Sequence, residues 1–145
     1  MLSKKTKYAI LALVKLAREY NKGPILIRDI ASSENIPKKF LESILNDLKH
    51  AGILSSAKGK GGGYYLKQKP EDVNMATVLR LFDGAIGYIP CVTFQYYERC
   101  DECADEETCA VRDVFKKVRE ESVKILSAST LAEMIKTEQK LKSEK

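Results

Sequence analysis

The feature that most constrains the fold of this sequence is the glycine-rich segment Lys58–Tyr65, which reads Lys-Gly-Lys-Gly-Gly-Gly-Tyr-Tyr. Three consecutive glycines are costly in conformational entropy, so they are expected where the backbone needs a positive φ or passes close to another segment. Residues 53–57 and 64–68 on either side favour strands. The pattern therefore predicts a β-hairpin with residues 58–63 at its tip.

Two short helices are predicted immediately before this hairpin. Residues 28–34 favour a helix, Asn35 and Ile36 make a turn, and Pro37 suits the first position of the next helix. Apolar residues then recur at helical spacing until Gly52. A short turn between two helices, followed by a hairpin, predicts a winged helix-turn-helix, in which the start of the second helix meets the DNA major groove.

Further helices are expected around this motif. Residues 5–20 lack Gly and Pro and favour a buried first helix, and a short strand is expected over 25–27. Asn74 suits the N-cap of a helix over 75–82 that closes the core, and Thr130–Glu133 resembles a capping box that starts a short last helix. The Lys-rich end after Thr137 is expected to fray.

A long charged helix is expected between these two caps. It carries a narrow stripe at helical spacing, formed by Val111, Phe115, Val118, Ser122, Ile125 and Leu126. Such a stripe needs a partner surface, and a two-fold homodimer is the expected solution. The predicted fold class is mainly α with a small β-hairpin: a winged helix-turn-helix domain over 1–83, a cysteine-containing sensor loop over 84–109, and a dimerisation helix with a short last helix over 110–145.

The distribution of charge indicates which half faces a polyanion. Residues 1–70 hold 14 Lys and Arg against 5 Asp and Glu, whereas residues 71–145 hold 11 against 15. A basic half favours nucleic acid as partner, because neutralising phosphates releases condensed counterions. The longest apolar run, Tyr8–Val14, is too short to span a membrane, and no charged leader precedes it. A cytoplasmic protein without a membrane partner is expected.

Four cysteines, Cys91, Cys100, Cys103 and Cys109, lie within nineteen residues, and the rest of the chain has none. In a chain without a secretory signal, such a cluster favours a metal, iron–sulfur or redox site over a structural disulfide framework. Four thiolates also satisfy tetrahedral zinc, although Cys100-x-x-Cys103 has no second C-x-x-C beside it. The same pair favours a thiol–disulfide switch, and cysteines without a function are a further alternative.

Several segments together resemble the IscR-type (Rrf) family of bacterial winged-helix transcription regulators. They are Lys7-Tyr-Ala9, Ile36-Pro-x-x-Phe-Leu-Glu-x-Ile-Leu-x-x-Leu48, Ala51-Gly-Ile53, and Gly59-x-Gly-Gly-Gly-Tyr-x-Leu66 followed by Pro70. The resemblance covers nearly the whole chain and implies a dimeric repressor or activator whose long helices pair two subunits. Recognition helices and wings then read a pseudo-palindromic operator on double-stranded DNA.

The resemblance implies a set of DNA-binding residues in this chain. They are Arg28, Lys38, Lys39, Phe40, Ser43, Lys58 and Lys60. Lysines at such positions clamp phosphates or read guanine edges. The alternatives are that Lys38 and Lys39 form a solvated first turn and that Phe40 belongs to the core.

Several members of the family use three loop cysteines to bind an iron–sulfur cluster that senses iron–sulfur, nitric oxide or redox status. The resemblance implies Cys91, Cys103 and Cys109, whose spacing is similar to that of the family's three ligands, as ligands of a 2Fe–2S cluster, with Cys100 in addition. Arg112 occupies a position where some relatives have a histidine ligand, and the single histidine, His50, ends the recognition helix. The fourth ligand is then Cys100 or a group from the partner's first helix; zinc or no cofactor are the alternatives.

An enzyme and a DNA-free adaptor are the two other function classes that the sequence could encode. An enzyme is not expected, because the cysteines have no nearby histidine base and the chain has no phosphate-binding glycine loop after a strand. A DNA-free adaptor that uses the same helices for protein contacts is the second alternative. The sequence therefore predicts a dimeric DNA-binding regulator, a repressor that senses iron–sulfur, redox or nitric oxide status through its loop cysteines.

Overall fold

The structure is a computed structural model that describes residues 2–145. Ser3 is the N-cap of its first helix. Its Oγ accepts a hydrogen bond from the Thr6 backbone N–H at 3.1 Å, which satisfies one of the free donors at the start of α1 (Lys4–Arg18). Ala9, Ala12 and Leu13 are fully buried, so α1 lies at the centre of the core. The predicted first helix is confirmed.

The helix-turn-helix is formed by α2 (Ile27–Glu34) and α3 (Lys38–His50). Asn35 ends α2 in the left-handed conformation, with φ 54°, which asparagine tolerates better than most residues. Ile36 is buried in the turn, and Pro37 is the N-cap of α3. One face of α3 is completely buried and anchors the helix; it is made of Leu41, Ile44, Leu45 and Leu48. The opposite face is left for solvent or a ligand.

The hairpin consists of β1 (Leu54–Ala57) and β2 (Gly63–Leu66), antiparallel with Leu54 opposite Leu66 and Ala57 opposite Gly63. The strand expected over 25–27 is wrong. Ile25 makes a single bridge to Tyr64 through two backbone hydrogen bonds of 2.8 Å, and α2 already begins at Ile27. The predicted fold class, mainly helical with a winged helix-turn-helix and its small hairpin, is confirmed.

The next segment closes the core and then leaves it. After η1 (Pro70–Asp72), Asn74 caps α4 (Met75–Asp83) by accepting from the Thr77 N–H at 3.0 Å, as expected. Val78 of α4 is fully buried, and Leu79 and Phe82 pack against the core. Residues 84–109 form a long loop interrupted by one short 3-10 turn, η2 (Pro90–Val92).

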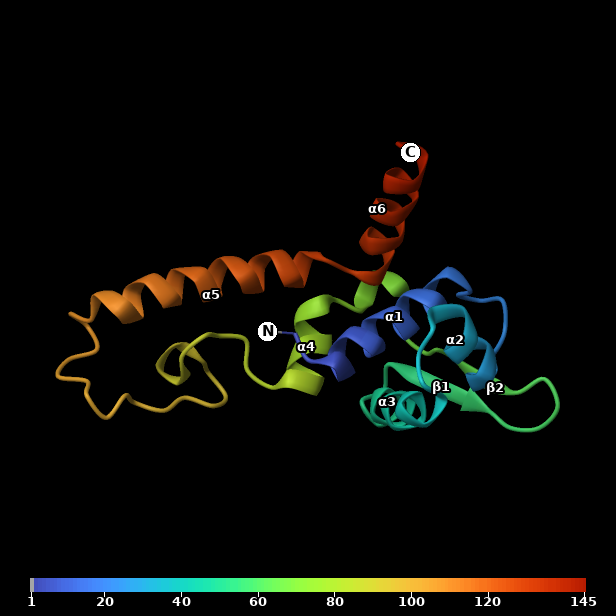
Figure 1. Cartoon of the computed structure of the whole chain (residues 1–145), viewed down its shortest axis with the longest axis horizontal. Helices are drawn as coiled ribbons and strands as arrows, with labels where there is room; N and C mark the ends of the chain where they lie inside the picture. Colours follow the sequence, from blue (N-terminus) through green and yellow to red (C-terminus); the bar gives the residue numbers. More distant parts are fainter. Residues whose placement is uncertain (1) are drawn as a thin grey trace.

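Two helices complete the chain. α5 (Ala110–Ala128) projects from the winged helix and carries the loop at its far end (Figure 1). α6 (Leu131–Ser143) contacts α1 and points away from the winged helix at a steep angle to α1. Thr130 caps α6 as predicted, accepting from the Glu133 N–H at 3.2 Å. The expected fraying after Thr137 is wrong, because Arg18 of α1 binds Glu138 of α6 with two hydrogen bonds of 2.9 and 2.6 Å.

The stripe predicted on α5 is divided between two faces of the helix. Phe115, Arg119 and Leu126 lie toward the same chain and are at least partly covered. An outer stripe remains exposed, formed by Val111, Val114, Val118 and Ile125. The predicted single stripe therefore corresponds to two surfaces of α5. One contacts the same chain, and the other remains exposed. Within residues 2–145, no helix is both long enough and apolar enough to cross a membrane.

Candidate functional site

The exposed face of α3 carries the first group of candidate DNA-binding residues. Lys38 and Lys39 lie in its first turn and Ser43 in the next, and all three are exposed. Neither lysine forms an ion pair with an acidic side chain of the described residues. Their charges are therefore not neutralised within the chain, and the buried face of α3 holds them outward.

Phe40 lies at the edge of this face and is 41% exposed. Its ring packs edge-on against Tyr8 of α1, with centroids 5.6 Å apart and planes at 84°. The side chain thus supports the orientation of α3 on α1 while part of its surface stays open. The two alternatives considered for Phe40, core residue and DNA contact, are compatible in this geometry.

The remaining candidates lie on α2 and on the wing, the segment 58–63 between the two strands. Arg28 is in the first turn of α2 with a side chain that is 75% exposed and a weak 3.8 Å pairing to Asp29. Lys58 and Lys60 are exposed in the wing. The wing is fixed to α3 through its first strand, because Lys49 Nζ donates a hydrogen bond of 2.7 Å to Ser56 Oγ.

One further residue of this surface escaped the sequence reading. Asn46 is exposed on α3 and lies one turn after Ser43, on the same face. An asparagine amide can donate to N7-side acceptors and accept from the amino group of adenine. The sequence does contain a signal for Asn46: it follows Lys39 and Ser43 at helical spacing, and residues three or four apart on a helix share a face.

The cysteines gather around a second site, at the far end of α5. Cys91, Cys100, Cys103 and Cys109 all line one cavity of about 500 Å³. Cys91 comes from η2 and is 8% exposed, while Cys109 is the N-cap of α5, its sulfur accepting from the Arg112 N–H at 3.4 Å. The loop therefore brings together thiols that are up to eighteen residues apart in sequence.

The turn that carries Cys100 and Cys103 is held by its own polar groups. The Cys103 N–H donates to the Cys100 carbonyl at 3.1 Å. The Cys100 thiol donates to a Glu102 carboxylate oxygen at 3.0 Å, and this hydrogen bond raises the pKa of Cys100. Cys100 is exposed, whereas Cys103 is half-buried. The four cysteines are not paired in disulfides in this structure and differ in their access to solvent.

The cavity offers thiol donors without holding them in a finished metal geometry. Among residues 2–145, no three Cys, His, Asp or Glu side chains stand close enough together to hold a metal ion. Arg112, on the first turn of α5, lines the same cavity, and its buried Nε has no hydrogen-bond partner in the described chain. A thiolate-bound, anionic group in this cavity would supply the acceptor that Arg112 lacks. The donor set and this orphaned N–H therefore fit an iron–sulfur cluster.

Comparison with known proteins gives a consistent result. A family model described as Rrf2, iron-dependent transcriptional regulator, matches residues 2–137. An Rrf2-like helix-turn-helix transcriptional regulator of Rhodobacter capsulatus is 38% identical over 138 residues, covering 93% of this chain and 92% of the relative.

Solved structures share the same fold. CymR, the global cysteine regulator of B. subtilis, superimposes with a TM-score of 0.80 at 23% identity, covering 94% of this chain and 97% of the other. An IscR of T. potens superimposes with a TM-score of 0.75 at 25% identity, covering 94% of this chain and 87% of the other.

Proposed function

The chain belongs to the Rrf2 family of transcriptional regulators, and we propose that it is a homodimeric repressor controlled through its cysteine loop. The family consists of DNA-binding regulators rather than enzymes, so double-stranded DNA is its partner. The observation that carries the proposed control is that all four cysteines line one cavity at the far end of α5.

The DNA contacts that we propose form a clamp with two basic points. Lys38 and Lys39 at the start of α3 enter the major groove, where a helix N-terminus also favours the phosphate backbone. Lys58 and Lys60 on the wing neutralise phosphates beside the groove. Arg28, Ser43 and part of Phe40 complete the surface. Because the bridge between Ile25 and Tyr64 joins the wing to the start of α2, the two points keep a fixed separation.

The outer stripe of α5 supports a homodimer. Val111, Val114, Val118 and Ile125 are between 39% and 63% exposed, although each is a large apolar side chain. Their spacing of three, four and seven residues matches the seam between two helices. A second copy of α5 would cover this stripe. Burial of four such side chains on each protomer would contribute several kcal/mol in total, at about 25 cal/mol per Å².

The charges on α5 favour an antiparallel arrangement of the two copies. Its first ten residues carry four basic and one acidic side chain, whereas its last nine carry one basic and two acidic. A parallel pair would place Glu121, which lies beside the stripe, next to its own copy, and like charges at this distance repel. In an antiparallel pair the basic half of one helix lies along the acidic half of the other.

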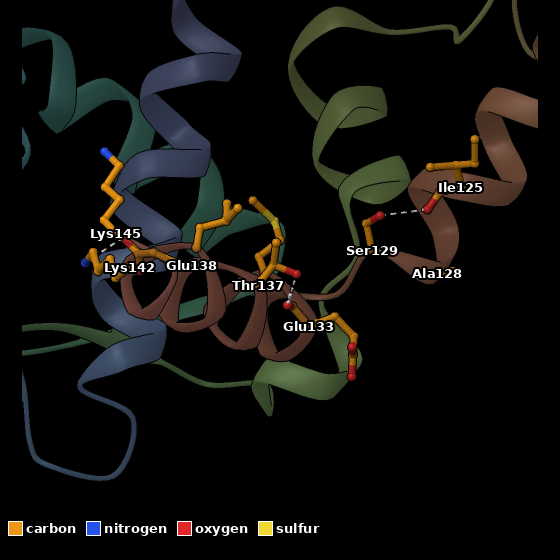
Figure 2. A pocket seen from close by; sticks show the side chains of 10 residues that line it. Ile125, Ala128, Ser129, Glu133, Thr137, Glu138, Lys142 and Lys145 are labelled. Atoms are coloured by element: carbon orange, nitrogen blue, oxygen red, sulfur yellow. Dashed lines mark hydrogen bonds and ion pairs between the residues drawn. The ribbon is translucent and has the colours of Figure 1, made fainter.

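A groove at the other end of α5 extends this surface. It measures about 750 Å³ and lies between Ile125 and Ser129 on one side and α6 residues such as Glu133 and Thr137 on the other (Figure 2). The groove continues the outer stripe through Ile125. An antiparallel partner would place the first turn of its own α5 here, which brings each cysteine cavity close to the partner's helical body.

The dimer is tested by one substitution at the centre of the stripe. Val118→Glu places two carboxylates together at the two-fold axis and is expected to give a monomer in analytical ultracentrifugation. Ser127→Glu adds the same charge on the opposite side of α5 and should remain a dimer. A dimeric Val118→Glu variant would show that the outer stripe is not the interface.

For the sensing chemistry, we propose that Cys91, Cys103 and Cys109 hold a 2Fe–2S cluster. Cys100, or a group from the partner's first helix, completes the ligand set. An iron–sulfur cluster supplies reactivity toward oxidants and nitric oxide and a reversible loss of iron. Arg112 lines the same cavity and would offer its unpaired Nε–H to the cluster as a hydrogen-bond donor, at the position where some relatives have a histidine ligand. Cys91, which is almost fully buried, fixes one side of the site to η2.

A thiol–disulfide switch is the second candidate, and the turn at Cys100 and Cys103 favours it. The hydrogen bond between the backbones of these residues folds the segment back on itself, and both thiols reach the cavity. Oxidation would remove two electrons and two protons from the pair and join the two sulfur atoms. Zinc bound by the four thiolates is the other cluster-free alternative.

The proposed cofactor is tested on protein purified without oxygen. The visible absorption spectrum and the iron, sulfide and zinc contents are measured on the same sample. A brown protein with iron and sulfide, and loss of the colour in Cys91→Ser and Cys109→Ser, supports the cluster. Cys100→Ser decides whether Cys100 is the fourth ligand. A colourless protein with about one zinc per chain, or one that only forms a Cys100–Cys103 disulfide, contradicts it.

A further inference from the structure

Arg119 is the one charged side chain in the described residues that is buried without a partner. It lies on the inner face of α5, is 8% exposed, and its Nε makes no hydrogen bond within residues 2–145. None of the ion pairs of the described chain includes it. The guanidinium stacks on the ring of Phe94 at 4.0 Å, which offsets part of the cost of burial but gives the Nε–H no acceptor.

An uncompensated buried arginine is costly in a free-standing fold. Removing a charge from water costs several kcal/mol unless a counter-charge and hydrogen bonds replace the lost hydration, so buried arginines almost always face an acid or an anion. No acidic residue of the long loop lines a cavity beside Arg119. The acidic side chain next to it on α5 is that of Glu120, which is exposed. The residues around Arg119 therefore supply no paired counter-charge, and a bound anion would provide one.

A cavity of about 210 Å³ opens beside Arg119 and has no acidic residue in its lining. Arg80 of α4 lines the same cavity, and it too has no acidic partner among the described residues. Thr93 and Gln95 add polar groups, while Ala85, Ile86 and Phe94 supply apolar walls. The Thr93 hydroxyl already donates to the Pro90 carbonyl at 2.9 Å, so its oxygen faces other groups as an acceptor only.

We propose that this cavity is a binding site for a small oxyanion, a carboxylate or phosphate group held between Arg80 and Arg119. A guanidinium presents paired N–H donors that match the two oxygens of a carboxylate or phosphate. The cavity is smaller than the roughly 300–1,000 Å³ of sites for drug-sized ligands, which restricts the ligand to a compact metabolite or an inorganic anion. The apolar walls leave room for a short carbon skeleton attached to the anionic group.

The cavity lies where three parts of the chain meet. Arg80 belongs to α4, Thr93 and Gln95 follow η2 directly, and Arg119 belongs to α5. A bound anion would therefore join the winged-helix body, the segment that carries Cys91 and the long helix. This site is separate from the cysteine cavity, because none of the thiols lines it. It stands whether or not the cysteines bind a cluster.

The test is a binding titration on the purified full-length protein without DNA. Inorganic phosphate and succinate are titrated separately by calorimetry, with ionic strength held constant by sodium chloride. Saturable binding of at least one anion, at one site per chain, is expected. The tighter of the two probes shows whether the site prefers a phosphate or a carboxylate.

Two variants and one control locate the binding. Arg119→Met keeps the aliphatic stem, and Arg80→Met changes an exposed residue that cannot affect folding through burial. Each substitution is expected to lower the affinity for the anion by about tenfold to a hundredfold, the range for the loss of a charged hydrogen bond. Lys140→Met removes the same charge from the exposed face of α6 and should bind as the parent does.

Three results would overturn the assignment. Neither probe saturates, or binding is equal in the parent and both arginine variants, or Lys140→Met weakens binding as strongly as Arg119→Met. The last result would identify a general effect of net charge. A circular-dichroism melt of Arg119→Met shows that the variant is folded; if it is not, Arg80→Met alone decides.

Discussion

Replacing Gly63 with alanine is expected to separate the root of the wing from the segment that precedes α2. Gly63 has φ +141° and lies where β2 passes Ile25. A Cβ at this position would overlap the carbonyl group of Ile25 and come within 2.8 Å of the Leu26 nitrogen. These are backbone atoms, so the clash cannot be relieved by a change of rotamer. β2 and the segment that precedes α2 must move apart at the bridge between Ile25 and Tyr64.

The cost can be assembled from two parts. The bridge contains two backbone hydrogen bonds of 2.8 Å, and losing both costs about 1–3 kcal/mol. Holding an alanine at positive φ costs about 1–2 kcal/mol more. Gly61→Ala provides the matched control, because Gly61 also has positive φ, +79°, but no atom within 4 Å of its added Cβ. Gly61→Ala should therefore carry only the second part.

Urea denaturation measures the difference. Gly63→Ala is expected to lower the free energy of unfolding by about 2–5 kcal/mol and Gly61→Ala by about 1–2 kcal/mol. Mobility-shift titration should show weaker operator binding for Gly63→Ala, since Lys58 and Lys60 lose their fixed position. Equal stability of the two variants would refute the argument, because it would mean that the close approach to Ile25 does not restrain the wing.

Two more predictions concern charge. Lys39→Ala combined with Lys60→Ala removes four proposed phosphate contacts from the dimer, and the slope of log affinity against log salt should fall by about 3–4. The second prediction concerns the link between α1 and α6, where hydrogen bonds from Arg18 hold the pKa of Glu138 below its ordinary value. The ionised Glu138 contributes to stability above the pKa that its carboxyl group has in the unfolded chain. This contribution is lost as the pH falls through the lower pKa that the group has in the folded chain. Glu138→Gln should therefore destabilise the protein by about 1 kcal/mol at neutral pH and by less below about pH 4, in urea melts.

Matched controls separate these effects from general changes of charge. Lys136→Ala combined with Lys140→Ala removes the same number of positive charges from α6, and it should leave the salt slope unchanged if α3 and the wing carry the contacts. A slope that falls equally in both double variants would contradict the proposed interface. For the acid effect, Arg18→Gln should destabilise at least as much as Glu138→Gln at neutral pH, because it also removes the 3.4 Å contact of Arg18 with Glu34, and the effect should again shrink at low pH. A destabilisation by Glu138→Gln that is independent of pH would exclude the pair as its source.

Local signals predicted the winged helix because they act within a few residues. Pro37, the glycine-rich wing and the cap at Asn74 each determine their own turn or helix end. The wing and the Asn74 cap were found where expected, and Pro37 is the N-cap of α3, one residue before the predicted first helical position. The extent of α6 was missed for the opposite reason. It depends on Arg18 and Glu138, which are 120 residues apart, so that composition alone pointed to a frayed end.

The sites divide in the same way. The cysteine cluster was visible as a pattern, but its cavity arises only when the loop folds back on the first turn of α5 and brings Arg112 beside the thiols. Arg119 carried no signal at all. In a charged helix an arginine is expected on the solvated face, and only the position of Phe94 and the loop shows that its side chain is buried.

In the proposed dimer, the way α5 is attached would let a change in the loop affect DNA binding without altering α3. The end of α5 is tied to the start of α4 by backbone hydrogen bonds from Met75 to Ser129 and from Leu131 to Val73, of 3.0 and 2.9 Å. A helix fixed at this end and joined to a partner along its length acts as a lever. Any change at the cysteine cavity that tilts α5 then alters the distance between the two recognition helices.

Operator half-sites lie one turn of DNA, roughly 34–36 Å, apart, so this distance alone decides whether both recognition helices can bind. A ligand of the cysteine cavity can change the affinity for DNA only by the difference in its own affinity for the two tilts of α5. The coupling is reciprocal, and DNA must change the affinity of the cavity by the same factor. A rigid connection at Ser129 and Leu131 is therefore as necessary to the proposed sensor as the thiols themselves.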